Sequence, residues 1–174
     1  MTLAARNRII GLIVAAVIFV LDQGLKGYVT GPLGLREDGQ TLVLNGIFSL
    51  TRTSNYGVSL GFLTAKSMEM RWLLVFLTAG IALVVLIWLL REKLRGDIIP
   101  LGLVLGGALG NIRDRFNHGH VIDYADLHFG SFRPFLVFNL ADAAITIGVV
   151  IILARSFLIR EKRPQPAGDP AMEI

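Results

Sequence analysis

The sequence contains no cysteine, and its three histidines all lie in one segment. The absence of cysteine excludes disulfides, thiolate metal ligands and a cysteine nucleophile. His118, His120 and His128 do not form the H-E-x-x-H pattern of zinc proteases, and this pattern occurs nowhere in the chain. We therefore predict no metal and no cofactor.

Charged residues are also scarce. They make up 17% of the 174 residues, whereas 53% are hydrophobic, and the mean hydropathy is +0.63. A soluble domain of this length could not bury so much apolar side chain, so we predict a polytopic membrane protein in contact with membrane lipids. The net charge is +4, but no basic stretch is interleaved with aromatic residues, so no nucleic-acid partner is expected.

Four apolar segments predict four transmembrane helices, over residues 9–29, 72–90, 98–112 and 135–154. No small-x-small cleavage site follows the first segment, so we expect it to be retained rather than removed as a signal peptide. Gly102, Gly106 and Gly110 recur every four residues and predict that another helix approaches the third span closely.

Asn45-Gly46 lies between two short segments rich in β-formers and predicts a small external β-hairpin over residues 40–53. Residues 121–128 alternate apolar and polar side chains, which predicts an extended segment within a loop. The predicted fold class is thus an all-α membrane protein with four transmembrane helices and a small external sheet. It forms one domain over residues 1–160, and a proline-rich tail over 161–174 is predicted to be disordered.

The basic residues predict the orientation. They precede the first span, fill the turn between the second and third, and follow the fourth. The positive-inside rule places these sites, both termini and the tail in the cytoplasm, so the two long loops face outward. Asp142, seven residues after Phe135, then lies about 10 Å below the outer surface.

Asp142 interrupts the last apolar run, and a carboxylate at that depth costs a few kcal/mol, which indicates a functional residue. Asn139, three residues earlier, is predicted to share its helical face. Asp22 and Lys26, spaced i,i+4 at the end of the first span, can form an ion pair. Spacing alone does not decide which second carboxylate joins Asp142; the candidates are Asp22, Asp114, Asp123 and Asp126.

Three chemistries compete. Gly57-Val58-Ser59-Leu60-Gly61 matches the G-x-S-x-G motif of serine hydrolases, but that motif needs a large α/β sheet for which four spans leave no room, so we interpret it as a chance match. A polar path through the spans would suit a small polytopic transporter or assembly factor, although no internal repeat supports one. A pair of aspartates sharing one proton would suit peptide hydrolysis, with one acting as general base and the other as general acid.

Five blocks in order carry a family resemblance. They are Leu21-Asp22-Gln23-x-x-Lys26, Asn55-x-Gly57, Gly106-Gly107-Ala108-Leu109-Gly110-Asn111-Ile112-x-Asp114-Arg115, Val121-Ile122-Asp123-Tyr124 and Phe138-Asn139-Leu140-Ala141-Asp142. Together they resemble the lipoprotein signal peptidase (signal peptidase II) family from Ile9 to about Arg155. The resemblance implies an aspartyl endopeptidase of the bacterial cytoplasmic membrane, and we expect a monomer. Its substrate would be a diacylglyceryl-modified prolipoprotein, cut just before the lipidated cysteine.

The resemblance also implies that Asp123 is the catalytic partner of Asp142, which leaves Asp114 and Asp126 in supporting or surface roles. The remaining matched residues are expected to support the site or bind substrate; they are Asp22, Lys26, Asn55, Gly57, Gly107, Asn111, Arg115 and Asn139. Arg115 is expected to tether the segment that bears Asp123. Where the family usually has small residues and a phenylalanine before a glycine, this chain has Val58-Ser59-Leu60-Gly61.

Overall fold

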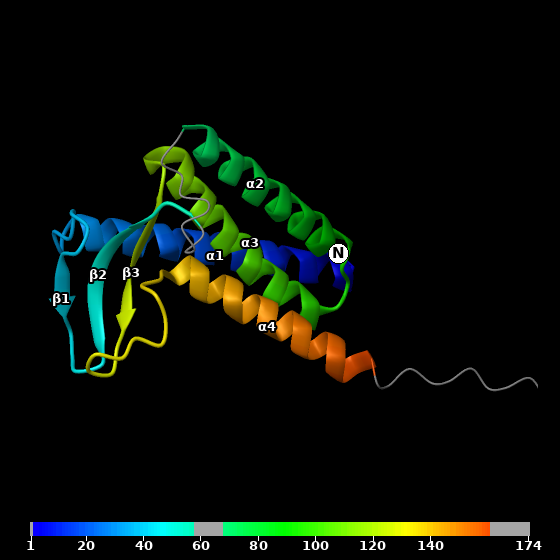
Figure 1. The fold of residues 1–174 in the computed structure, drawn as a ribbon. Helices are drawn as coiled ribbons and strands as arrows, with labels where there is room; N and C mark the ends of the chain where they lie inside the picture. The colour runs from blue at the N-terminus through cyan, green and yellow to red at the C-terminus, as the bar shows by residue number, and fades with distance from the viewer. Residues whose placement is uncertain (1, 58–67, 161–174) are drawn as a thin grey trace, which may run out of the picture.

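The computed structural model describes residues 2–57 and 68–160. Four helices form a bundle, and a small sheet lies at one end of it (Figure 1). The helices are α1 (Leu3–Thr30), α2 (Met68–Arg91), α3 (Arg95–His118) and α4 (Leu140–Arg160). The described chain is thus mostly helical, as the hydrophobic segments predict.

Helix α3 occupies the centre and packs against α1, α2 and α4 (Figure 1). The predicted close approach along its glycine row is confirmed. A Cβ atom on Gly102 would lie 2.5 Å from the carbonyl oxygen of Gly11, well inside van der Waals contact, and Gly106 and Gly110 also face α1. The absence of side chains at these positions lets α1 lie directly on the backbone of α3.

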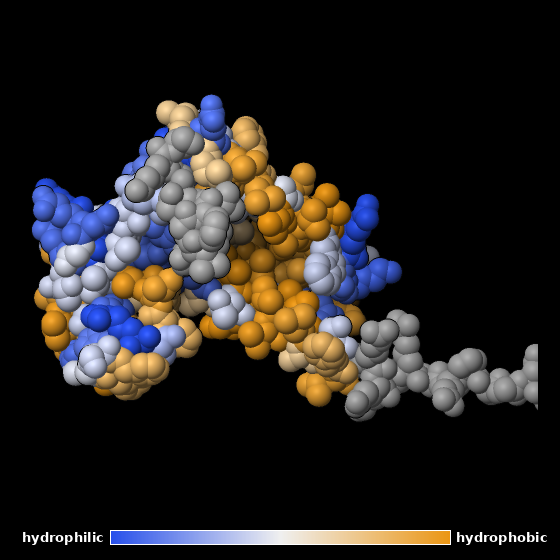
Figure 2. All heavy atoms as spheres, in the orientation of Figure 1, coloured by the Kyte–Doolittle hydropathy of each residue, from blue (hydrophilic) through white to orange (hydrophobic). Residues whose placement is uncertain are grey.

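Three of the described helices are long and apolar enough to cross a membrane: α1, α2 and residues Leu140–Leu158 of α4. Figure 2 shows a largely hydrophobic surface over the middle of the helices, whereas the surface at the sheet end mixes hydrophilic and hydrophobic side chains. Helix α3 lacks the hydropathy of the other three because its buried positions include glycines and the polar residues Asn111 and Asp114. The fourth span therefore stays a prediction.

Helix α4 begins at Leu140, five residues after the predicted start of the span at Phe135. The reason is that Phe138 pairs with the sheet: its backbone N–H donates to the carbonyl of Ala125 at 3.0 Å. Part of the apolar run is therefore a strand partner. Asp142 consequently lies in the first turn of the helix, and not two turns inside it.

The sheet has three antiparallel strands in the order β1 (Thr41–Val43), β2 (Phe48–Asn55) and β3 (Val121–Leu127). The hairpin predicted at Asn45-Gly46 is confirmed, and the Asn45 side chain accepts from the N–H groups of Ile47 and Phe48 at 3.0 and 2.9 Å. The segment predicted as extended is β3. It is a strand bonded to β2 rather than part of a loop, and it brings Asp123 opposite Thr53.

The other end of the bundle joins the start of α1 to the turn between α2 and α3, where Asn7 Nδ2 donates to the carbonyl of Lys93 at 2.9 Å. The last turns of α4 reach the same end, since Arg155 pairs with Asp97 at 2.7 Å. The N-terminus therefore lies far from the sheet (Figure 1).

Candidate active site

Asp142 lies at the N-terminus of α4, where it exchanges hydrogen bonds with Asn139. The Asn139 side-chain oxygen accepts from the Asp142 N–H at 2.9 Å, and Asp142 Oδ2 accepts from the Asn139 N–H at 3.4 Å. This reciprocal pattern is a capping box, in which Asn139 precedes the helix. The prediction that Asn139 and Asp142 share a helical face is therefore wrong, although the two residues do contact each other. The capping box holds the Asp142 carboxylate at the positive end of the helix dipole.

Asp123 comes from β3, and only 2% of its surface is exposed. Its two oxygens accept from Asn139 Nδ2 at 2.6 Å and from Asn55 Nδ2 at 3.0 Å. Burial, together with repulsion from Asp142, raises the pKa of Asp123 to about 7. This carboxyl therefore holds a proton at pH values where an exposed aspartate would have lost it.

Two asparagine side chains join the two carboxylates. Asn111 Nδ2, from α3, donates to Asp142 Oδ1 at 2.8 Å. Asn139 Nδ2 donates to Asn111 Oδ1 at 3.2 Å as well as to Asp123. Among the described residues, Asn139 alone hydrogen-bonds to both carboxylates: its side chain donates to Asp123 and its backbone N–H donates to Asp142. The sequence motifs that contain these four residues thus meet at one place.

A buried ion triad contacts the asparagine bridge at Asn111. Lys26 Nζ lies 2.8 Å from Asp22 Oδ2 and 2.7 Å from Asp114 Oδ2, and all three side chains are at most 3% exposed. Lys26 also donates to Asn111 Oδ1 at 3.2 Å. The i,i+4 ion pair predicted in the first span is confirmed, and the triad is bonded directly to the asparagine bridge.

The triad also anchors the elements that bear the carboxylates. Asp22 Oδ1 accepts from the N–H of Ala141 in the first turn of α4 at 3.1 Å. Asp114 Oδ2 accepts from the N–H of Ile122 in β3 at 3.2 Å. Asp114, which the sequence left in a supporting or surface role, is fully buried. Hydropathy alone could not find it, because its partners are distant in the sequence.

Gly57 and Gly107 support the site through their backbones. The Gly57 N–H donates to the Asn55 side-chain oxygen at 3.1 Å, which turns the amide nitrogen of Asn55 toward Asp123. Gly57 has a φ of +145°, a conformation that favours glycine. A Cβ on Gly107 would lie 2.5 Å from the carbonyl oxygen of Ala141, so glycine here lets α3 approach the start of α4.

Arg115 is half-buried next to this network. Among the residues that the structure describes, it forms no ion pair with a carboxylate, and its buried Nε has no hydrogen-bond partner. The described contacts therefore do not include the expected tether to the segment of Asp123. Its carbonyl instead accepts from Arg71 Nε at 2.9 Å, which caps the end of α3.

Tyr124 is a further site residue that was quoted in a motif but given no role. Its buried hydroxyl oxygen accepts from the N–H of Leu140 at 3.3 Å, so it contacts the first residue of α4. Burial raises its pKa to about 12. The aromatic residue after Asp123 in the motif was a signal that this position could matter. The sequence alone, however, does not indicate that the Tyr124 hydroxyl contacts α4.

The histidines lie apart from the two carboxylates in the described structure. His128 Nε2 lies 3.0 Å from Ser49 Oγ, and His120 Nε2 lies 3.1 Å from a guanidinium nitrogen of Arg52. Ser59, the serine of the G-x-S-x-G match, and its neighbours Val58 and Leu60 lie outside the described residues. The tail predicted to be disordered, residues 161–174, also lies outside them.

Comparisons with known proteins identify a family that this chain resembles over most of its length. A family model described as signal peptidase (SPase) II matches residues 14–158. The chain is 52% identical to the lipoprotein signal peptidase of Rhizorhabdus wittichii over 157 residues, which cover 90% of this chain and 91% of that protein. It is 49% identical to the lipoprotein signal peptidase of Sphingopyxis alaskensis over 163 residues, covering 94% of each.

A solved structure has the same fold. It is described as a bacterial membrane enzyme determined by the in meso method at 2.3 Å resolution, and it superposes with a TM-score of 0.73 at 25% identity. The superposition covers 90% of this chain and 93% of the other.

Proposed function

Because this chain belongs to the signal peptidase II family, we propose that it is an aspartic peptidase in which Asp123 and Asp142 are the catalytic residues. The observation that carries this proposal is that Asn139 bonds to both carboxylates. The family is one of membrane proteases, so the alternative of a small transporter or assembly factor has no support.

The substrate that we propose is a diacylglyceryl-modified prolipoprotein, since the relatives are named lipoprotein signal peptidases. The enzyme would remove the signal peptide by cutting the bond before the lipidated cysteine. Its apolar helices suit a substrate whose acyl chains stay in the bilayer beside them. Asn55 and Gly57 lie next to Asp123 and are placed to contact the peptide backbone.

In the proposed reaction, two nearby carboxylates share one proton, because ionising both is unfavourable. In this proposal the shared proton starts on Asp123, whose pKa is raised by burial. Asp142 takes a proton from water, whose oxygen attacks the scissile carbonyl while Asp123 polarises that carbonyl. The C–N bond then breaks, and the leaving amine takes a proton from the pair. One proton remains on the two carboxylates, as at the start.

The topology that we propose has four spans, with α3 as the fourth. Its polar residues are shielded by α1, α2 and α4, so low hydropathy does not prevent it from lying in the bilayer. Basic residues gather at the end remote from the sheet, which we place in the cytoplasm of a bacterial inner membrane together with both termini. The site then lies near the outer face, and the enzyme acts as a monomer.

The test is replacement of each catalytic aspartate by asparagine. Asp123→Asn and Asp142→Asn are each expected to lower kcat by about 10²–10⁴-fold or more, the usual range for loss of a general acid or base. Cleavage of a purified diacylglyceryl-prolipoprotein would be measured, with thermal unfolding as the check on folding.

Asp126→Asn is the matched control. Asp126 lies on the same strand and is also buried, but it bonds to Arg133 and Thr51 and not to the bridge. It should retain most activity. Full activity in either catalytic variant would overturn the assignment.

A further inference from the structure

A second feature of the bundle lies on the face of α3 that does not bear the asparagines. Between α1, α2 and α3 runs an apolar groove with a volume of about 500 Å³. It is lined by residues such as Ala16 of α1, Ala79 of α2 and Leu109 of α3. The groove exists because α2 packs mainly on α3 and touches α1 only slightly, and because small residues line its walls.

The groove continues toward the sheet end of the bundle. An adjoining cavity of about 390 Å³ shares Phe19, Leu109 and Ile112 with it and ends at Phe116 and Arg113. From residue 105 to residue 116, α3 rises about 16 Å at 1.5 Å per residue. That length matches half of the roughly 30 Å hydrocarbon core of a bilayer. The groove therefore has the length of an acyl chain in one leaflet.

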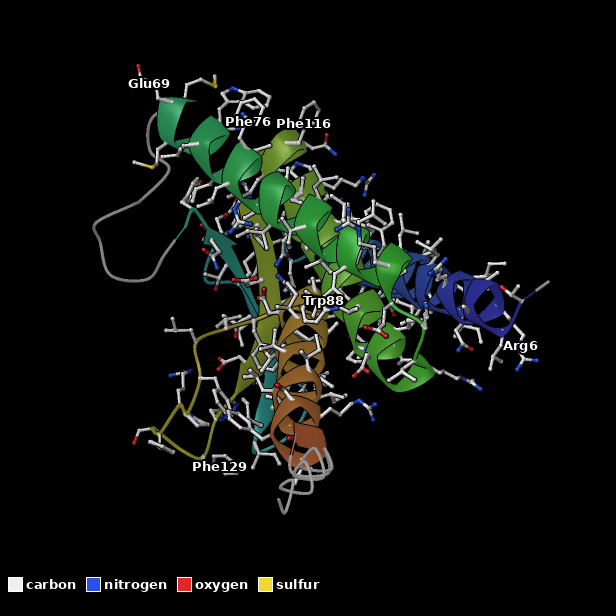
Figure 3. The ribbon with its side chains drawn as sticks, turned by 90° about the vertical axis from the view of Figure 1, so that its right-hand side faces the viewer. Arg6, Glu69, Phe76, Trp88, Phe116 and Phe129 are labelled. Carbon is white, nitrogen blue, oxygen red and sulfur yellow. The ribbon has the colours of Figure 1, made fainter. Side chains whose placement is uncertain are left out.

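The end of the groove carries a cation and aromatic rings. Arg113 is exposed and donates to the side chain of Gln23, and none of the described ion pairs includes it. Phe116 packs against Trp72, with ring centroids 5.6 Å apart, as is common at membrane interfaces. Figure 3 shows Phe76 and Phe116 toward the end of α2 marked by Glu69 and far from Arg6.

Arg113 also lines a polar cavity of about 330 Å³, together with Arg36, His118 and the ion-paired Lys26 and Asp114. One arginine thus lies where an apolar groove meets a polar, basic cavity. A cation between helices at interface depth attracts anionic headgroups, and the guanidinium fork suits phosphate oxygens. The apolar groove and the positive charge at its end are complementary to a phospholipid with a net negative headgroup.

We propose that this groove binds one anionic phospholipid, with an acyl chain between α1 and α2 and its phosphate at Arg113. The site is separate from the catalytic pair, because it uses the face of α3 that bears Leu109 and Ile112 and not the face that bears Asn111. It does not depend on the proposed peptidase activity.

The experiment measures lipid binding by native mass spectrometry of the delipidated full-length protein, with phosphatidylglycerol or phosphatidylethanolamine added back. The wild type is expected to retain one phosphatidylglycerol in preference to phosphatidylethanolamine. Arg113→Gln should reduce that preference about fivefold, whereas Arg113→Lys should keep most of it. Ala16→Trp, which fills the groove, should abolish retention of either lipid.

Val17→Trp is the matched control, because Val17 neighbours Ala16 on the exposed side of α1 but does not line the groove. It should bind lipid as the wild type does. Equal binding by the two tryptophan variants, or an unchanged preference in Arg113→Gln, would overturn the proposal. A dimer that Ala16→Trp dissociates would also overturn it, since a second copy would then be the occupant.

Discussion

Two pairs of carboxylates lie side by side in this protein, three of them buried and Asp142 half-buried, and their charges are balanced differently. Asp22 and Asp114 have Lys26 between them, with both Nζ–O distances below 3 Å. Asp123 and Asp142 have only the amide groups of asparagines as side-chain partners among the described residues. The first pair is therefore in direct contact with a full positive charge, whereas the second is not: Arg115 acts on it electrostatically but forms no ion pair with it among the described residues.

This difference in charge balance suits the two pairs to different roles. The ion triad holds both of its carboxylates in contact with one ammonium group and bonds them to the backbone of other elements, so it suits a fixed anchor for α4 and β3. Amides orient a carboxylate but do not cancel its charge, so the second pair suits the sharing of one proton, which the proposed acid–base catalysis requires. Lys26 connects the two. Because it donates to Asn111 Oδ1, the NH₂ group of Asn111 must point toward Asp142.

The largest effect is expected when the anchor loses its cation. Lys26→Met would leave Asp22 and Asp114 buried without a counter-charge, which typically costs about 3–5 kcal/mol. We expect the variant to unfold at a much lower temperature than the wild type and to lose activity as a consequence. Thermal unfolding in detergent would measure this.

A triple variant serves as its control, with Lys26→Met, Asp22→Asn and Asp114→Asn combined. It removes the charges together and should recover part of the lost stability, because no unpaired charge then remains buried. If Lys26→Met alone is as stable as the wild type, the triad is not an anchor.

The next effect is a pH dependence from the pair that is proposed to be catalytic. Burial and Asp142 raise the pKa of Asp123 from 3.8 to about 7. Below that value the pair keeps its proton; above it the general acid is lost, and kcat/KM should fall about tenfold per pH unit. The folded state also binds this proton more tightly than the unfolded state, so stability should decrease as pH rises from 3.8 to about 7. An activity that stays constant well above pH 7 would contradict the assignment.

A smaller effect tests the amide contact at Asp123. The hydrogen bond from Asn55 lowers the pKa of Asp123, although burial outweighs it. Asn55→Ala should therefore move the alkaline limb of the pH profile to higher pH. Thr51→Ala is the control, since Thr51 lies on the same strand and bonds to Asp126 instead. If the alkaline limb of the pH profile moves equally in both variants, the shift comes from a general disturbance of the sheet and not from the Asn55–Asp123 hydrogen bond.

The smallest effect is expected at Ser59, the serine of the chance G-x-S-x-G match. Ser59→Ala should retain most of the activity, because the proposed chemistry needs no serine nucleophile. The same lipoprotein cleavage assay would measure it. Complete loss of activity in a folded protein would favour a serine mechanism over the aspartate pair.

Sequence reasoning was accurate where a local pattern reports a local structure. The i,i+4 spacing predicted the Asp22–Lys26 ion pair, and Asn45-Gly46 predicted the hairpin. It failed where hydropathy was used to delimit helices. Phe138 belongs to the apolar run because it pairs with β3, and it does not lie in the helix. The prediction that a helical span starts at Phe135 therefore placed the start of α4 too early. Helix α3 likewise continues past 112 to His118.

By itself, the sequence determined the membrane class, the helical content, the glycine face of α3 and, through a family resemblance, the two aspartates proposed as catalytic. These follow from composition, short spacings and motifs, which are properties of neighbouring residues. Only the tertiary structure decided that Asn139 contacts both carboxylates, that Asp114 completes a buried triad with Lys26, and that Asp142 lies in the first turn of α4. The physical reason is that hydrogen bonds and burial depend on partners far apart in the chain, and no local pattern specifies which distant groups will meet.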